Sequence, residues 1–256
     1  MVLPRSMVEY ATDNITVYRY CLYQCQYCWA HRIPLFRSRI WRGKYDPVKE
    51  AEKYLRIRDR RTIVVSFTSD PYIPDEISER KTRKVLLTLS RSNHKVMVLT
   101  KAPNLACMLD LDVFIFSNAE MWLGTTVISL EKTDLEPLAP KPQTRLNSLK
   151  YAKMHGVKTW LSIEPIIPYI TFPEDIVEQT INYVDWYVLG AYNYYSRLRL
   201  PRVNRYIPDE GRFTRRELET WYRIHVTKAV KLLKEYNKPF FIKKELKKYL
   251  GDGFES

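Results

Sequence analysis

Glycine, long apolar runs and dispersed cysteines are all scarce in this sequence of 256 residues. Only seven glycines occur, so flexible connecting segments are rare and no interdomain linker is evident. No run approaches the roughly 18 apolar residues of a membrane-spanning helix. The stretch from Met1 to Asp13 lacks the basic-then-apolar pattern of a secretory signal. We therefore expect a cytoplasmic protein without a membrane span.

The length suits one large domain that buries its core without disulfides. We find no repeats and no low-complexity segment. The sequence predicts a single domain over residues 1–256, with its core at about 12–192. A C-terminal extension at about 193–256 would carry a basic aromatic segment and a long helix.

The net charge of +13 favours polyanionic partners, nucleic acid above all, through counterion release. Surfaces rich in lysine and glutamate also occur in hyperthermophile proteins, for reasons unrelated to nucleic acid. Charge by itself leaves both interpretations open.

Apolar periodicity predicts strands that alternate with helices. The expected strands cover Ile15–Tyr20, Thr62–Phe67, Lys95–Thr100, Trp122–Ile128, Val157–Ile163, Trp186–Gly190 and Phe240–Ile242. The expected helices cover Glu76–Ser92, Pro142–His155, Pro173–Tyr183 and Thr214–Tyr236. This order indicates an α/β fold with a parallel sheet, curled by right-handed crossovers into a partial (βα)6-type TIM barrel. Ligands of such sheets bind at the carboxyl ends of the strands.

Three of the four cysteines fall within eight residues, directly after the first expected strand: Cys21, Cys25 and Cys28, spaced C-x3-C-x2-C. Clustered cysteines in an apparently cytosolic chain indicate metal or redox chemistry. Three thiolates on one loop can bind three irons of a [4Fe–4S] cubane. The fourth iron then remains open to chelate a small molecule through amino and carboxylate groups.

Two weaker alternatives exist for the cysteines: a structural zinc site and a chance group of buried thiols. Structural zinc prefers four protein ligands, and zinc ribbons pair two C-x2-C knuckles. No second knuckle exists here, because Cys107 stands alone. We expect Cys107 to be a buried small apolar side chain, and no histidine pair has metal-ligand spacing.

Polar side chains lie in or just after the last residues of the other expected strands. They include Ser69, Asp70, Lys101, Thr126 and Glu164. The first two suit a ligand with an ammonium group, although a serine–aspartate turn with a helix cap explains them better when they are taken alone. The lysine could meet a cofactor carboxylate or be a solvated surface residue. The glutamate lies in an apolar stretch and therefore needs a partner or a ligand.

A basic aromatic segment, residues 192–206, follows the sixth strand. It interleaves tyrosines with Arg197, Arg199, Arg202 and Arg205. Arginine for phosphates and tyrosine for base stacking is typical of a single-strand nucleic-acid surface. The alternative is a solvated loop with a few packed tyrosines.

The cysteine loop, with Tyr27 before its last cysteine, resembles the C-x3-C-x-aromatic-C signature of the radical S-adenosylmethionine superfamily. The resemblance implies that the thiolates hold the cluster and that S-adenosylmethionine ligates the open iron. An electron donor would reduce the cluster, and cleavage of the cofactor would give a 5′-deoxyadenosyl radical. Tyr27 would lie near the adenine.

Further motifs resemble the branch that contains spore photoproduct lyase and DNA-repair-photolyase-like proteins. The matching pieces are Thr-Ser-Asp-Pro-Tyr at 68–72, Thr-Lys at 100–101, and the segments 135–146 and 165–168. The resemblance runs from about residue 14 to 171, with weaker likeness beyond. It implies cofactor contacts by Ser69, Asp70, Lys101 and Thr126.

One departure concerns the hydrogen donor. Spore photoproduct lyase has a cysteine two residues before the serine of its Thr-Ser-Asp turn, and Phe67 stands there in this chain. Reversal of a thymine dimer therefore lacks its thiol donor, unless Cys107 serves. The DNA-binding hairpin of that lyase is not recognisable either.

Three hypotheses follow. The first is a radical S-adenosylmethionine enzyme that abstracts hydrogen from a substrate, with nucleic-acid repair or modification preferred. The second keeps the chemistry and changes the substrate to a small molecule or a peptide. The third is a non-catalytic nucleic-acid-binding module whose cysteines hold zinc. The sequence identifies no catalytic residue and no oligomeric state.

Overall fold

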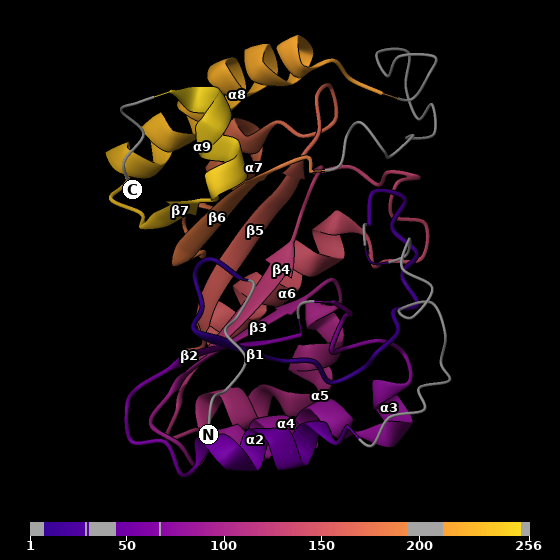
Figure 1. Cartoon of the computed structure of the whole chain (residues 1–256), viewed down its shortest axis with the longest axis vertical. Coiled ribbons are helices and arrows are strands. Elements are labelled where there is room, and N and C mark those ends of the chain that lie inside the picture. Colours follow the sequence, from indigo (N-terminus) through magenta and orange to yellow (C-terminus); the bar gives the residue numbers. More distant parts are fainter. Residues whose placement is uncertain (1–7, 29, 31–44, 67, 194–211, 252–256) are drawn as a thin grey trace.

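A curled sheet of parallel strands, with helices on its outer side, forms the body of the molecule (Figure 1). The computed structural model describes residues 8–28, 30, 45–66, 68–193 and 212–251. Seven strands lie side by side in chain order, and each pairs in parallel with the next. They are β1 (Asp13–Ile15), β2 (Thr62–Val65), β3 (Lys95–Thr100), β4 (Glu120–Thr126), β5 (Lys158–Ile166), β6 (Trp186–Ala191) and β7 (Phe240–Ile242). The predicted partial TIM barrel is confirmed, with seven strands instead of six units.

Eight helices in the described residues connect or follow these strands. They are α2 (Pro47–Tyr54), α3 (Glu76–Glu79), α4 (Lys81–Leu89), α5 (Pro103–Ile115), α6 (Pro142–Met154), α7 (Pro173–Thr180), α8 (Arg215–Glu235) and α9 (Lys244–Leu250). Proline occupies the first turn of α2, α5, α6 and α7. Its fixed φ suits that position, and its missing N–H costs nothing there. The prolines therefore determine where these helices begin. Helix α8 begins instead with a capping box between Thr214 and Glu217.

Several predicted boundaries were wrong by a few residues, and two larger differences have local reasons. The helix expected over Glu76–Ser92 is broken at Arg80, whose φ of 53° is left-handed. The break lets the buried Glu76 carboxylate cap α4, where it accepts the N–H groups of Thr82 and Arg83 at 2.9 and 3.1 Å. The strand expected over Ile15–Tyr20 ends at Ile15, because Val17 donates its N–H to the Ser66 side chain and leaves the sheet ladder.

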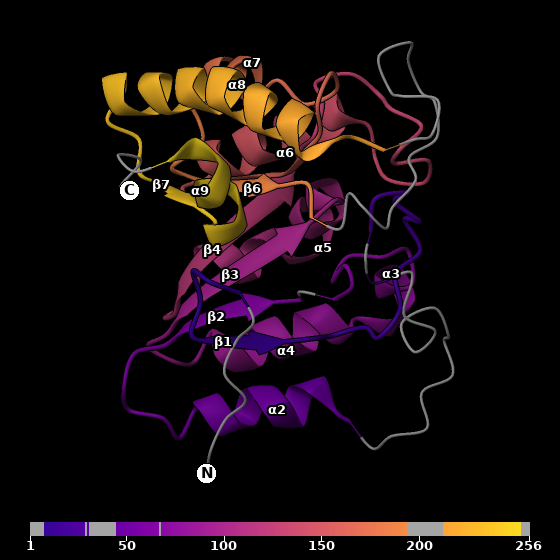
Figure 2. The same ribbon diagram turned by 45° about the horizontal axis from the view of Figure 1, so that its top comes forward.

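Alternating strand residues divide into two apolar clusters. One face of the sheet packs against the helices and forms the larger core. The other face is concave and carries Val64, Met97, Trp160 and Val188, which pack against Val8 near the N-terminus. Figure 2 shows the helices outside the curl and the inner face free of them. The inner cluster fills the barrel near the amino ends of the strands, so ligand space remains only at the carboxyl ends.

Two glycines give large side chains room on this inner face. A Cβ on Gly124 would lie 2.3 Å from the Trp160 ring, which is fully buried and donates its indole N–H to the Val98 carbonyl at 3.1 Å. A Cβ on Gly190 would lie 2.5 Å from the carboxyl carbon of Glu164. Trp160 is confined, whereas the partly exposed Glu164 can move.

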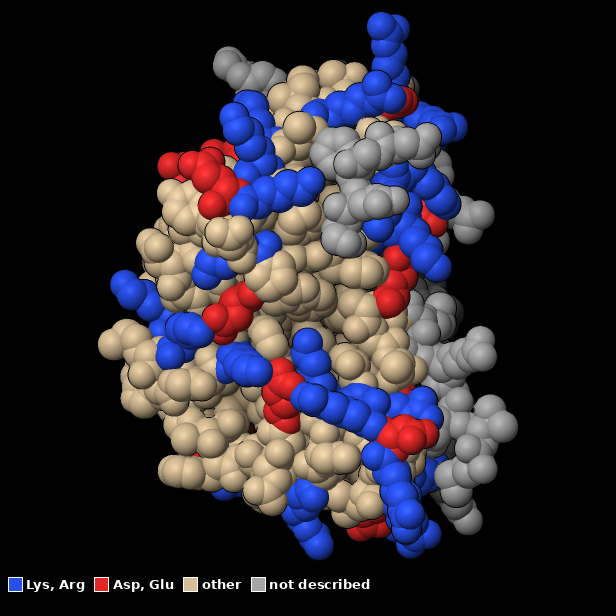
Figure 3. Space-filling view, turned by 90° about the vertical axis from the view of Figure 1, so that its left-hand side faces the viewer, with Lys and Arg blue, Asp and Glu red and all other residues tan. Residues whose placement is uncertain are grey.

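Charged residues of both signs are interspersed on the face that points to the left of Figure 1 (Figure 3). At the amino ends of β4 and β5, Glu120 pairs with Arg60 and with Lys158, so part of the positive charge is compensated there. No helix in the described part of the chain is both long and apolar enough to cross a membrane.

Replacing Gly124 by alanine should lower the free energy of unfolding by about 1–3 kcal/mol or more, because the confined Trp160 ring cannot move aside. Gly190→Ala is the matched control and should cost less, since Glu164 can rotate away. Urea unfolding followed by circular dichroism measures both. Equal losses in the two variants would contradict this account of the inner face.

Candidate functional site

The cysteine loop follows β1 and is tied to the β2–α4 connection by tyrosines. Tyr18 donates to Glu76 at 2.6 Å, Tyr20 to Asp75 at 2.5 Å, and Tyr23 to the Tyr72 carbonyl at 2.5 Å. These hydroxyls satisfy polar groups that burial would otherwise leave unpaired. The loop is thereby held against the carboxyl edge of the sheet.

All eight predicted cluster and cofactor residues line one cavity of about 150 Å³ at this edge. They are Cys21, Cys25, Tyr27, Cys28, Ser69, Asp70, Lys101 and Thr126. Ser66 and Leu99 also line the cavity. Ser66 stands two residues after Val64, and Leu99 two residues after Met97, and both of these belong to the inner apolar cluster. Because side chains alternate along a strand, the cavity continues the inner face of the barrel.

The three thiols of the cysteine loop line this cavity together. Cys25 is buried and the other two are partly buried. Among the described residues, no three His, Cys, Asp or Glu side chains are placed to hold a single metal ion. A cubane distributes its thiolate ligands over different irons. Burial raises the pKa of Cys21 and of Cys25 to about 12, so cation binding must displace their protons.

Asp70 fastens the turn after β2 to the end of β3. Its Oδ1 accepts the Tyr72 N–H at 2.9 Å and the Thr100 hydroxyl at 2.6 Å, and its Oδ2 accepts the Lys101 N–H at 2.7 Å. Burial raises the pKa of Asp70, and these hydrogen bonds oppose the rise. Ser69 donates its hydroxyl to the Tyr18 carbonyl. Both residues thus shape the cavity wall through contacts within the chain.

A buried ionic network lies beside the cysteines. The Lys101 ammonium is 2.7 Å from Glu136 Oε1 and 2.7 Å from the Tyr27 hydroxyl, which also donates to Glu136. Arg145, only 1% exposed, binds Glu136 Oε2 at 2.6 Å and the Thr126 carbonyl at 2.9 Å. Burial raises the pKa of Glu136, but Lys101 and Arg145 more than offset this and lower it to about 2. Glu136 is therefore an anion that fixes two cations and Tyr27.

Glu136 and Arg145 were not predicted as site residues, although both lie in segments that carry the family resemblance. Two signals pointed to them. Glu136 follows an apolar leucine inside a proline-rich stretch, and Arg145 stands beside Leu146 on the buried face of α6. A charge at such a position requires a partner.

Other predicted residues lie elsewhere. Glu164 has the partner that its apolar setting demanded, Lys243 at 2.8 Å. Cys107 lies on α5, where its thiol contacts the Ser148 carbonyl at 3.5 Å, and it does not line the cavity. Phe67 and the four arginines at 197, 199, 202 and 205 lie outside the described residues.

Comparison with curated sequences found two relatives, whereas no family model matches the chain. The uncharacterized protein MJ0683 of Methanocaldococcus jannaschii is 31% identical over 186 residues, which cover 70% of this chain and 70% of MJ0683. The uncharacterized protein ORF301 of Acidianus two-tailed virus is 29% identical over 121 residues, which cover 46% of this chain and 39% of ORF301.

Comparison with solved structures found the same fold in two enzymes. Spore photoproduct lyase complexed with dinucleoside spore photoproduct matches with a TM-score of 0.65 and 14% identity, over 94% of this chain and 78% of the lyase. SuiB of Streptococcus suis bound to S-adenosylmethionine matches with a TM-score of 0.54 and 14% identity. That alignment covers 90% of this chain and half of SuiB.

The chain shares the fold of these two solved structures, and its cysteine loop lies at the carboxyl edge of the sheet. Sequence identity makes the narrower assignment. The chain belongs to the family of the M. jannaschii protein MJ0683.

Replacing Glu136 by glutamine should lower the free energy of unfolding at neutral pH by about 3–5 kcal/mol, because two buried cations lose their counter-ion. In the native chain the pKa of Glu136 falls from 4.5 to about 2. The corresponding stabilisation, about 3 kcal/mol, is present above pH 4.5 and is lost as the pH falls toward 2.

Urea unfolding of the native chain and of Glu136→Gln at several pH values measures this loss. The difference between the two should shrink below pH 4.5, where the native carboxylate takes up its proton. Glu131→Gln, an exposed carboxylate in the same loop, is the control and should change stability by less than about 0.5 kcal/mol. A loss in the control as large as that in Glu136→Gln would refute the role of the network.

Proposed function

We propose that Cys21, Cys25 and Cys28 bind a [4Fe–4S] cluster and that the chain uses it to cleave S-adenosylmethionine. When bound, the cluster supplies the electron that releases a 5′-deoxyadenosyl radical, which abstracts hydrogen from a substrate. A separate electron donor must reduce the cluster. The observation that carries the proposal is the convergence of all eight predicted residues on one cavity.

The chain's own residues would hold the cofactor and keep water from it. Ser69, Asp70, Lys101 and Thr126 form the wall opposite the cysteine loop. We assign the cofactor carboxylate to the Lys101 ammonium, which the Glu136 carboxylate holds at the cavity wall. Tyr27 belongs to the cysteine loop and lines the same cavity, and we assign its ring to the adenine.

Positive charge beside the thiols supports the same assignment. Lys101 lowers the pKa of Cys25 against the larger effect of burial. Three thiolates in a buried site need nearby cations, because an uncompensated buried charge is costly. Glu136 neutralises part of this charge and fixes the cations in place.

The substrate that we propose is a nucleic acid. The net charge of +13 and the fold shared with a lyase solved with a dinucleoside photoproduct support this class. SuiB, solved with its precursor peptide SuiA, supports a peptide as the alternative. Thymine-dimer reversal with thiol quenching is disfavoured, because Phe67 replaces the donor cysteine and Cys107 lies away from the cavity.

Anaerobic reconstitution tests the cluster. The native chain should bind about four irons and four sulfides and should form 5′-deoxyadenosine from S-adenosylmethionine under dithionite. Cys25→Ala should lose both properties, because one iron loses its ligand. Cys107→Ala is the matched control and should keep both, since this thiol contacts the Ser148 carbonyl outside the cavity. Zinc without iron and sulfide in the native chain would establish the zinc-module alternative.

Salt dependence tests the substrate class. Affinity for single-stranded oligonucleotides should fall steeply as potassium chloride rises, because phosphate contacts release condensed counterions. Fluorescence anisotropy at several salt concentrations measures the slope of log K against log salt. A slope near zero, or tighter binding of a peptide without acidic residues than of the oligonucleotides, would favour a peptide substrate.

A further inference from the structure

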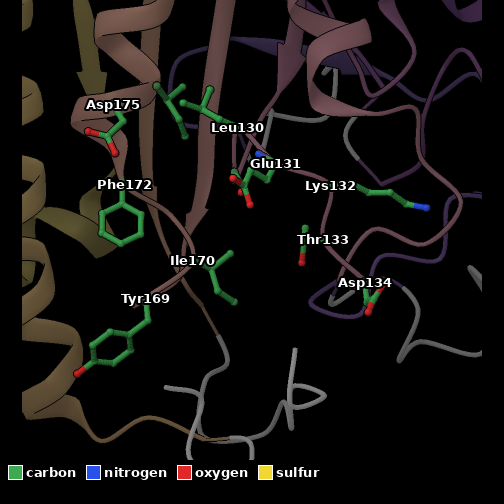
Figure 4. Close-up of a pocket in the computed structure, with 11 residues that line it drawn as sticks. Leu130, Glu131, Lys132, Thr133, Asp134, Tyr169, Ile170, Phe172 and Asp175 are labelled. Atoms are coloured by element: carbon green, nitrogen blue, oxygen red, sulfur yellow. Dashed lines mark hydrogen bonds between the residues drawn. The ribbon is translucent and has the colours of Figure 1, made fainter. Parts of the chain in front are cut away.

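A second cavity, of about 500 Å³, opens at the same edge of the sheet (Figure 4). Residues 129–134 after β4 form one side, and Tyr169, Ile170 and Phe172 after β5 form the other. Its volume lies within the roughly 300–1,000 Å³ of small-ligand sites. The cavity is not part of the predicted cofactor site, because none of its lining residues is shared with the cavity of the cysteines.

The loop after β4 separates the two cavities. Its residues 129–134 line the larger one, and the Leu135 carbonyl next to them accepts the Gln26 N–H of the cysteine loop at 2.9 Å. Glu136, the following residue, binds Lys101 and Tyr27 in the smaller cavity. A group bound in the larger cavity is therefore one short loop away from the proposed cofactor.

The wall after β5 is aromatic and fixed from behind. The ring centroids of Tyr169 and Phe172 lie 4.7 and 5.1 Å from that of Trp221 on α8. Trp221 is itself held by a 3.1 Å hydrogen bond from its indole N–H to the Thr171 carbonyl. Tyr169 and Phe172 each remain 37% exposed. Such a wall can stack a planar group at little entropic cost.

The wall after β4 accepts hydrogen bonds. Figure 4 shows Glu131, Thr133 and Asp134 across the cavity from Phe172, with the Lys132 side chain directed away. Within the described part of the chain, no group donates a hydrogen bond to the carboxylates of Glu131, Asp134 or Asp175. The cavity is thus lined by three carboxylates, two on this wall and that of Asp175 on α7, and by the single ammonium group of Lys132. This excess of negative charge favours N–H donors and repels phosphate.

Three exposed arginines are close in the chain to Phe213, which packs against the aromatic wall. Phe213 packs against Tyr169 with 6.2 Å between ring centroids, and the exposed Arg212, Arg215 and Arg216 are its neighbours in the chain. Two of these arginines lie in the first turn of α8, where the positive end of the helix dipole disfavours cations. An anionic partner would offset this unfavourable placement, and a basic peptide would add to it.

We propose that this cavity binds a nucleobase with an exocyclic amino group, in a strand whose phosphates contact Arg212, Arg215 and Arg216. The base would stack on Phe172 and Tyr169 and donate its amino hydrogens to the carboxylates opposite, as cytosine N4 donates to Asp or Glu. Thymine and uracil present carbonyl oxygens instead of an amino group, so they are disfavoured. Only the role of the bound base as a substrate rests on the proposed function. Binding of the base in this cavity does not depend on it.

Fluorescence anisotropy of the full chain with labelled single strands of about 12 nucleotides tests the cavity. Oligo(dC) and oligo(dA) should bind about 5- to 100-fold more tightly than oligo(dT). Oligo(rC) distinguishes RNA from DNA as the source of the base. Phe172→Ala should weaken binding of oligo(dC) about 5- to 100-fold through lost stacking. Phe116→Ala, which removes an 83% exposed ring after α5, is the matched control and should bind like the native chain.

A second variant keeps the test valid if Phe172→Ala unfolds. Glu131→Ala combined with Asp134→Ala alters only exposed side chains and should remove the preference for oligo(dC) over oligo(dT). Equal affinities of the native chain for the two oligonucleotides would overturn the proposal. An arginine-rich peptide that displaces oligo(dC) in solution and occupies the cavity in a crystal structure would overturn it as well.

Formation of 5′-deoxyadenosine by the native chain without oligonucleotide is measured separately. If none forms while the base preference is present, the proposed radical chemistry fails and the base site stands. If 5′-deoxyadenosine forms without a base preference, the radical chemistry stands and the base site fails.

Discussion

A buried carboxylate between two buried cations is the interaction on which this site depends. Glu136 joins the loop after β4 to Lys101 at the end of β3, to Tyr27 in the cysteine loop and to Arg145 on α6. Each of these groups would be costly to bury alone, because the protein interior solvates charge poorly. Together they fix four separate segments at one edge of the sheet. The cysteine loop is thereby held to the end of β3 and to the loop after β4 through Tyr27.

The parallel sheet explains why two cavities lie at the same edge. Large aromatic side chains, above all Trp160, fill the inner face near the amino ends, and Gly124 provides the space that this ring needs. Ligands are thereby confined to the carboxyl ends, where the connecting loops can vary without loss of the core. The cysteine loop lines the smaller cavity, and the larger one lies between the loops after β4 and β5.

The charges of the two cavities differ in a way that suits their proposed roles. Lysine and arginine border the smaller cavity, where thiolates and a carboxylate-bearing cofactor would sit. Carboxylates and aromatic rings border the larger one, and the chain neighbours of Phe213, which packs against Tyr169, include three arginines. A nucleic-acid strand matches this division, since its bases carry N–H donors and its backbone carries the negative charge.

The sequence by itself determined the alternation of strands and helices, the partial barrel and the positions of the proposed cofactor residues near the ends of the strands. Periodicity, prolines and the cysteine spacing are local signals, and the carboxyl ends of parallel strands must meet at one edge. Only the tertiary structure decided the pairing of Glu136 with Lys101 and Arg145, the break of the helix at Arg80, and the cavity between the loops after β4 and β5. These features depend on contacts between residues far apart in the chain. A charge in an apolar stretch of the sequence predicts that a partner exists, but it does not identify the partner.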